Sequence, residues 1–105
     1  MKDFWLEKFE KEVYPIINER LNPKQVILFG SRAIGKGSDD SDLDIIIISE
    51  KFRTIHKLQR MSFVLKQLNF KKHIDILFYT PDEFERAKKT SAVVQDALEN
   101  SYYIS

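Results

Sequence analysis

Two apolar segments lie near the middle of the chain, reading VILFGSR at residues 26–32 and SDLDIIII at residues 41–48. Their branched apolar composition is typical of β-strands. Because side chains alternate across a strand, we expect Asp42 and Asp44 on the same face of the second segment. At ~4 Å and an effective dielectric near 20, two such carboxylates repel by about 4 kcal/mol, so we expect a cation to offset them.

The first of these segments ends in Gly30 and Ser31. A glycine at a strand end lets a phosphate approach the backbone, and the neighbouring hydroxyl can hydrogen-bond that phosphate. Together with Asp42 and Asp44, these residues predict a site for a metal ion and a phosphate. For the two acids alone, the alternative is a solvated acidic turn next to a strand.

Length and composition limit the class of protein. The 105 residues provide for one modest hydrophobic core, so we expect a single domain over residues 1–105. The formal net charge of +1 gives no broad basic surface, so nucleic acid is not expected as a direct partner. The absence of cysteine excludes disulfides and thiolate chemistry. Charged residues interrupt the apolar ones near the N-terminus, so we expect a cytoplasmic protein with no membrane partner.

Apolar periodicity predicts the order of helices and strands. A helical segment over residues 3–21 should be kinked or split by Pro15. We expect strands at residues 25–29, 43–49 and 73–79, with the strand at 43–49 in a central position. A long helix is expected at residues 53–68, before the last of these strands. In the helix, a stripe that includes Leu58 is expected to pack in the core. A capping box at Thr80 and a cap at Ser91 should begin two further helices.

Asp75 is an acid inside the apolar strand predicted at residues 73–79. A buried carboxylate is costly unless it is paired or binds a metal. If that strand lies beside residues 43–49, Asp75 shares one cleft with Asp42 and Asp44. Three carboxylates together with substrate phosphates are suited to Mg²⁺, and two such ions would support phosphoryl or nucleotidyl transfer.

Simpler explanations exist for some of these residues. Asp75 could instead form a structural ion pair with Arg32 or Lys72. His56 and His73 have no companion at metal-ligand spacing, so both are predicted to be structural or exposed.

The sequence Gly30-Ser31-Arg32, followed by Asp42-Leu43-Asp44 and later by Asp75, resembles the minimal nucleotidyltransferases (MNT) of the DNA polymerase β superfamily. The resemblance covers nearly the whole chain and implies an α+β fold, with a small mixed β-sheet packed with helices. It further implies roles for individual residues. Gly30 and Ser31 would hold the terminal phosphates of the nucleotide. Asp42 and Asp44 would bind two Mg²⁺ ions, and Asp75 would bind one of them and help to activate the acceptor hydroxyl.

Arg32 also fits the family pattern, and we expect it to contact phosphate or the acceptor, or to lie on the surface. The implied activity is transfer of a nucleoside monophosphate, AMP from ATP, to a hydroxyl. The similarity to MNT antitoxins implies that this hydroxyl belongs to a partner protein such as a helical HEPN ribonuclease toxin. The alternative from another class is a non-catalytic module that binds nucleotide or partner. Transfer to a small molecule is a third hypothesis, disfavoured because the chain has no second domain.

Overall fold

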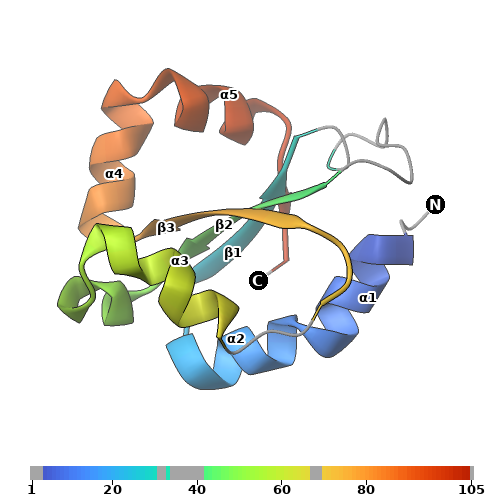
Figure 1. Ribbon diagram of the computed structural model, residues 1–105. Helices are drawn as coiled ribbons and strands as arrows, with labels where there is room; N and C mark the ends of the chain where they lie inside the picture. The colour runs from blue at the N-terminus through green and yellow to red at the C-terminus, as the bar shows by residue number, and fades with distance from the viewer. Residues whose placement is uncertain (1–3, 31–32, 34–41, 67–69, 105) are drawn as a thin grey trace.

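The computed structural model describes residues 4–30, 33, 42–66 and 70–104, and in it helices cover both faces of one sheet (Figure 1). The helices are α1 (Phe4–Glu12), α2 (Tyr14–Leu21), α3 (Lys57–Leu65), α4 (Pro81–Thr90) and α5 (Ala92–Glu99), with a 3₁₀ helix η2 at Glu50–Thr54. The strands are β1 (Gln25–Phe29), β2 (Leu43–Ile48), β3 (Ile74–Tyr79) and β4 (Tyr102–Tyr103). The expected α+β class is confirmed.

The four described strands lie in the order β3-β2-β1-β4. β2 pairs with β3 in parallel and with β1 in antiparallel orientation, and β4 pairs antiparallel with β1. The sheet is therefore mixed, and the strand expected at the centre does lie between two others. Its residues are apolar on both faces after Asp44, as a strand covered on both sides requires.

Each face of the sheet has its own apolar core, because successive strand residues point to opposite sides. On one face α1, α2 and α3 cover the side chains of Val26, Leu28, Ile45 and Ile47. On the other face α4 and α5 cover Ile27, Ile46 and Ile48. Asp44 and Asp75 alternate in phase with this second set, so their side chains belong to the α4 and α5 side of the sheet.

The helix ends follow the local sequence. The N-terminal helical segment is split at Val13, and Pro15 lies in the first turn of α2, where its missing N–H costs little. Thr80 and Glu83 form the expected capping box of α4, and the Ser91 side chain accepts a hydrogen bond from the Val94 N–H at the start of α5. These three predictions are confirmed.

The helix expected over residues 53–68 is shorter than predicted, and the expected core stripe is wrong at Leu58 and Met61, although Ile55 does pack against the core. The Leu58 side chain is 85 % exposed and Met61 is 38 % exposed, whereas Arg60 and Val64 are buried. The buried face of α3 therefore carries a charged residue. Arg60 can be buried there because hydrogen-bond acceptors surround its guanidinium.

The Arg60 guanidinium joins three elements beneath α3. It donates hydrogen bonds to the carbonyl oxygens of Phe52 (2.8 Å) and Phe78 (3.1 Å) and to the Glu83 carboxylate (2.7 Å). Its Nε also donates to the Ile55 carbonyl at 3.0 Å. Because Glu83 belongs to the capping box of α4, this cluster couples η2, α3, the end of β3 and the start of α4.

Two further features concern the edge of the sheet and the surface. β4 was not predicted, and its residues Tyr102 and Tyr103 pair with Leu28 and Ile27 of β1. Within the described ranges, no helix combines the length and the apolar character needed to cross a lipid bilayer.

Candidate active site

The parallel register of β2 and β3 brings the predicted acids together. Asp44 is the direct partner of Asp75 in the ladder. Continuing this register by one residue places Asp42, which precedes β2, beside His73, which precedes β3. The Leu43 N–H donates to the His73 carbonyl at 3.2 Å, so the backbone at this end of the two strands is fixed.

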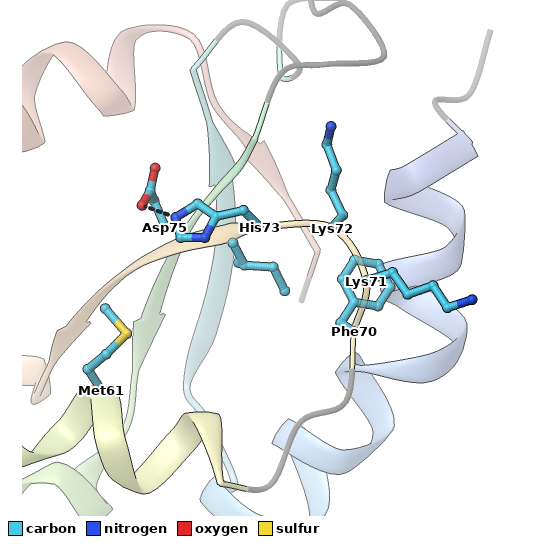
Figure 2. Close-up of a pocket in the computed structure, with 7 residues that line it drawn as sticks. Met61, Phe70, Lys71, Lys72, His73 and Asp75 are labelled. Atoms are coloured by element: carbon cyan, nitrogen blue, oxygen red, sulfur yellow. Dashed lines mark hydrogen bonds and ion pairs between the residues drawn. The ribbon is translucent and has the colours of Figure 1, made fainter.

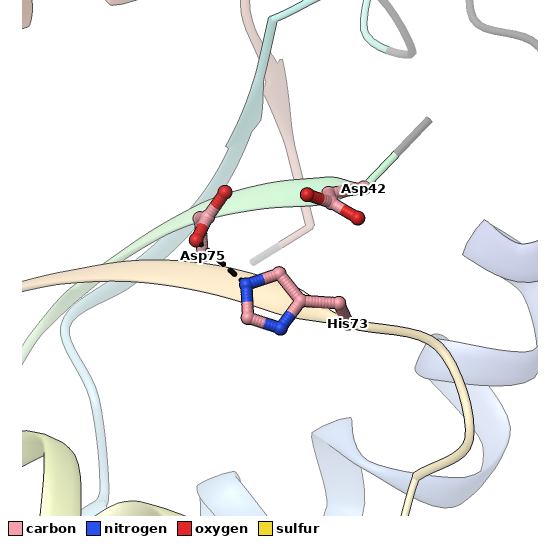
Figure 3. A group of neighbouring side chains, drawn as sticks. All are labelled: Asp42, His73 and Asp75. Atoms are coloured by element: carbon pink, nitrogen blue, oxygen red, sulfur yellow. Dashed lines mark hydrogen bonds and ion pairs between the residues drawn. The ribbon is translucent and has the colours of Figure 1, made fainter. Parts of the chain in front are cut away.

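Three of these side chains converge at the start of the two strands (Figure 3). One donor atom each of Asp42, His73 and Asp75 lies within 4.8 Å of the other two. The closest pair is His73 Nε2 and Asp75 Oδ1, at 2.9 Å. The side chains of His73 and Asp75 are 66 % and 59 % exposed, so the group is open to solvent.

These exposures correct one expectation about Asp75. It was expected to be a buried acid between two isoleucines, but it is the second residue of a strand at the edge of the sheet, and its carboxylate is exposed. Only the side chains of Ile74 and Ile76, on the opposite face, are buried. Its carboxylate lies within hydrogen-bond distance of His73 Nε2, whereas Arg32, one of the two ion-pair partners considered for Asp75, lies outside the described residues.

Asp44 is held differently, because its side chain is partly buried against Gly30. Burial raises the pKa of the Asp44 carboxyl above its ordinary value, and repulsion from Asp75 and then Asp42 raises this pKa further. His73 opposes the shift. A carboxylate with this environment is stabilised when a cation binds beside it.

Gly30 cannot be replaced by a larger residue without disturbing Asp44. Its φ is +79°, in the left-handed region that favours glycine. A Cβ at this position would lie 3.3 Å from the Asp44 Cγ and well inside 3.0 Å of its Oδ2. The glycine at the strand end thus leaves space for a site carboxylate. The other two residues expected to bind phosphate, Ser31 and Arg32, lie outside the described residues.

The prediction that His73 has no companion at metal-ligand spacing is wrong. Residues two apart on a strand point to the same side, so the sequence pattern His73-x-Asp75 already carried the necessary signal. What the sequence did not supply was the register, which adds Asp42 to the pair.

A cavity of about 510 Å³ opens beside this group (Figure 2). It lies between α3 and the segment leading into β3, and is lined by Met61, Phe70, Lys71, Lys72, His73, Ile74 and Asp75. The lining combines apolar side chains, two lysines and two exposed members of the acidic group, His73 and Asp75. A second molecule could therefore reach Asp75 from this direction.

The donor chemistry of the site fits a divalent cation. Carboxylate oxygens are preferred by Mg²⁺ and Mn²⁺, and an imidazole nitrogen is accepted by transition metals. Asp42, His73 and Asp75 can each offer one such atom, and Asp44 lies next to them on β2. A cation here would also offset the repulsion that raises the pKa of Asp44.

Comparison with known proteins decides the family. Residues 10–103 match the nucleotidyltransferase domain family. The chain belongs to this family. A relative from Methanocaldococcus jannaschii, named "Putative protein adenylyltransferase MJ0141", is 30% identical over 95 residues, which cover 90% of this chain and 89% of the relative. The motif resemblance noted in the sequence is thereby confirmed at the level of the family.

Solved structures share the fold of this nucleotidyltransferase domain. A structure whose title names a "putative nucleotidyltransferase" from Sulfolobus solfataricus superposes with a TM-score of 0.64 at 22% identity, covering 94% of this chain and 78% of the other. BolA1 from Arabidopsis thaliana superposes with a TM-score of 0.52 at 17% identity, over 67% of this chain and 88% of the other. Since proteins with different names share this arrangement, function has to be argued from the site.

Proposed function

We propose that this protein transfers AMP from ATP to a hydroxyl group on a partner protein, using divalent cations held by Asp42, Asp44 and Asp75. The observation that carries the proposal is the alignment of Asp44 with Asp75 in a parallel ladder, with Asp42 next to them, in a chain of the nucleotidyltransferase family. The name of the Methanocaldococcus jannaschii relative supports a protein acceptor.

Divalent ions at such a site neutralise charge on the attacking and leaving oxygens of an in-line displacement at phosphorus. Asp44 lies in β2, Asp42 just before it, and Asp75 in β3, so the carboxylates that would hold the ions, and through them the nucleotide phosphates, come from two hydrogen-bonded strands. Gly30 ends the neighbouring strand β1 and carries no side chain that would block the phosphates.

The acceptor is proposed to enter from the cavity beside Asp75. Its hydroxyl oxygen forms a bond to the α-phosphorus of ATP, while the bond from that phosphorus to the bridging oxygen breaks and pyrophosphate leaves. The hydroxyl proton passes to the Asp75 carboxylate, which is 59 % exposed and belongs to a residue that lines the cavity. The apolar lining contributed by Met61 and Phe70 suits the side chain or backbone of a protein segment better than a highly charged sugar.

The test uses ATP labelled at either the α or the γ phosphate, incubated with the full chain, a divalent ion and a cell lysate as a source of acceptors. We expect α label on protein and no transfer of γ label. Asp44→Asn should abolish the transfer, whereas Asp96→Asn, at an exposed position of α5, should leave it unchanged. A HEPN-type ribonuclease, the partner implied by the motif resemblance, is the first purified acceptor to test.

Three results would count against this proposal. Transfer of γ label alone would indicate a kinase-type reaction. Full turnover by Asp44→Asn would remove the acids from the mechanism. If no label is transferred but a partner protein is still inhibited by both the parent chain and Asp44→Asn, the protein acts as a non-catalytic binding module.

A further inference from the structure

His73 is the one described site residue whose chemistry the nucleotidyl-transfer proposal leaves unused. It precedes β3 on the same side as Asp75, and its ring lies among the carboxylates (Figure 3). We propose that His73 Nε2 is a ligand in this site, so that one metal position is a mixed nitrogen and oxygen site that selects Mn²⁺, Co²⁺ or Zn²⁺ over Mg²⁺. The inference deepens the proposed function by naming the class of metal.

The first argument is the distance between donor atoms. Two neighbouring ligands of an octahedral ion, each ~2.1 Å from the metal, are about 3 Å apart. His73 Nε2 and Asp75 Oδ1 are already 2.9 Å apart. A neutral imidazole with its hydrogen on Nδ1 presents a lone pair on Nε2, so both atoms could bind the same ion with little movement.

The second argument is the rigidity of the backbone that carries the ligands. His73 and Asp75 are two residues apart at the start of β3, and the His73 carbonyl accepts a hydrogen bond from the Leu43 N–H of β2. Asp42 comes from the neighbouring strand by the same parallel register. The three donor atoms already lie within 4.8 Å of one another, and rotation of exposed side chains can shorten the longer separations.

The third argument is metal selectivity. Mg²⁺ takes oxygen ligands almost without exception, whereas imidazole favours later first-row metals. Replacing one oxygen donor by nitrogen therefore raises the preference for Mn²⁺, Co²⁺ and Zn²⁺. The partly buried Asp44 offers only oxygen atoms. A second ion held by Asp44 and other carboxylates would therefore keep the preference for Mg²⁺ that is typical of oxygen ligands.

The decisive experiment measures metal binding without nucleotide. The full chain is loaded with Mn²⁺, and pulsed electron spin resonance is used to detect nitrogen coordinated to the metal. Selective ¹⁵N labelling of histidine is informative here because the sequence contains only two histidines. We expect nitrogen coupling in the parent chain, a change of that coupling on ¹⁵N-histidine labelling, and its loss in His73→Gln.

The matched control is His56→Asn. His56 caps α3 by accepting a hydrogen bond from the Leu58 N–H, and asparagine can also cap a helix. This variant should keep the nitrogen coupling. In parallel calorimetric titrations, His73→Gln should lower the ratio of Co²⁺ to Mg²⁺ affinity by about tenfold or more, since even residues one step removed from a metal often change affinity by that factor.

The inference is overturned if bound Mn²⁺ shows no coupling to histidine nitrogen in the parent chain, if the coupling survives in His73→Gln, or if the Co²⁺ to Mg²⁺ ratio does not fall. His73 would then be only a hydrogen-bond partner of Asp75. These readouts need no ATP and no acceptor. Nitrogen coordination without AMP transfer would thus reject the proposed function alone, and AMP transfer without nitrogen coordination would reject this inference alone.

Discussion

Replacing Gly30 by alanine should disturb the site through a single methyl group. The residue has a φ of +79°, and a left-handed backbone costs a non-glycine residue about 1–2 kcal/mol. The added Cβ would also overlap Asp44 Oδ2, and its distance to Asp44 Cγ would be only 3.3 Å. The carboxylate therefore has to move, and a displacement on the order of 1 Å in a catalytic site can lower turnover about 10²-fold.

These two costs can be separated with a double-mutant cycle. In an Asp44→Ala background the overlapping oxygens are absent, so Gly30→Ala should cost only the backbone strain. In the parent background it should cost more, with a coupling of roughly 0.5–3 kcal/mol, the range for residues in contact. Gly30→Asn offers a further control, because asparagine tolerates a left-handed backbone but still carries a Cβ.

The assay combines urea unfolding of the four proteins with α-labelled ATP transfer by the parent chain, Gly30→Ala and Gly30→Asn. We expect both glycine variants to lose turnover while remaining folded. The reasoning is refuted if Gly30→Ala costs the same free energy of unfolding in both backgrounds and its turnover stays close to that of the parent. In that case the contact between Gly30 and Asp44 would have no influence on the carboxylate.

Three further predictions concern charge. Asp44→Asn should abolish transfer and, without metal at pH 7, raise the free energy of unfolding. The reason is that the folded pKa of Asp44 is raised, so the ionised carboxylate costs stability as pH rises from 3.8 through that pKa. A loss of stability in chemical denaturation would contradict this. Arg60→Ala should cost about 3–5 kcal/mol, since the Glu83 carboxylate, 18 % exposed, loses its nearest cation and keeps only the Thr80 N–H and the more distant Lys57. Unchanged thermal stability would reject that role. The hydrogen bond from Arg60 lowers the folded pKa of Glu83 from 4.5 to about 2. Roughly 3 kcal/mol of stability should therefore be present above pH 4.5 and lost on acidification toward pH 2. In Glu83→Gln, the free energy of unfolding should lack this dependence on pH.

The sequence was sufficient to predict β1, β2 and β3 and the convergence of the acids. Alternation along β2 placed Asp42 and Asp44 on one side, and the only additional assumption was that β3 lies next to β2. The parallel ladder that pairs Asp44 with Asp75 confirms this assumption. Local signals were also sufficient at Thr80, because a capping box depends on residues close in sequence.

The remaining features depend on contacts between distant residues. Arg60 is buried because acceptors from η2, β3 and α4 surround it, and no periodicity of α3 could reveal them. The same contacts turn Leu58 outward. β4 has two residues and is defined by its pairing with β1, so its own composition gives too little information. His73 acquires its neighbours Asp42 and Asp75 through the register of two strands.

The assembly of this site from β2 and β3 has a consequence for folding kinetics. Asp42 and Asp44 meet His73 and Asp75 only after two strands that are far apart in the sequence have paired in parallel, and such non-local pairing is intrinsically slow. Early compact states that lack this pairing would bind divalent ions weakly. The appearance of tight metal binding during refolding would therefore mark the moment at which β2 and β3 find their register, and a bound ion should act mainly by slowing unfolding.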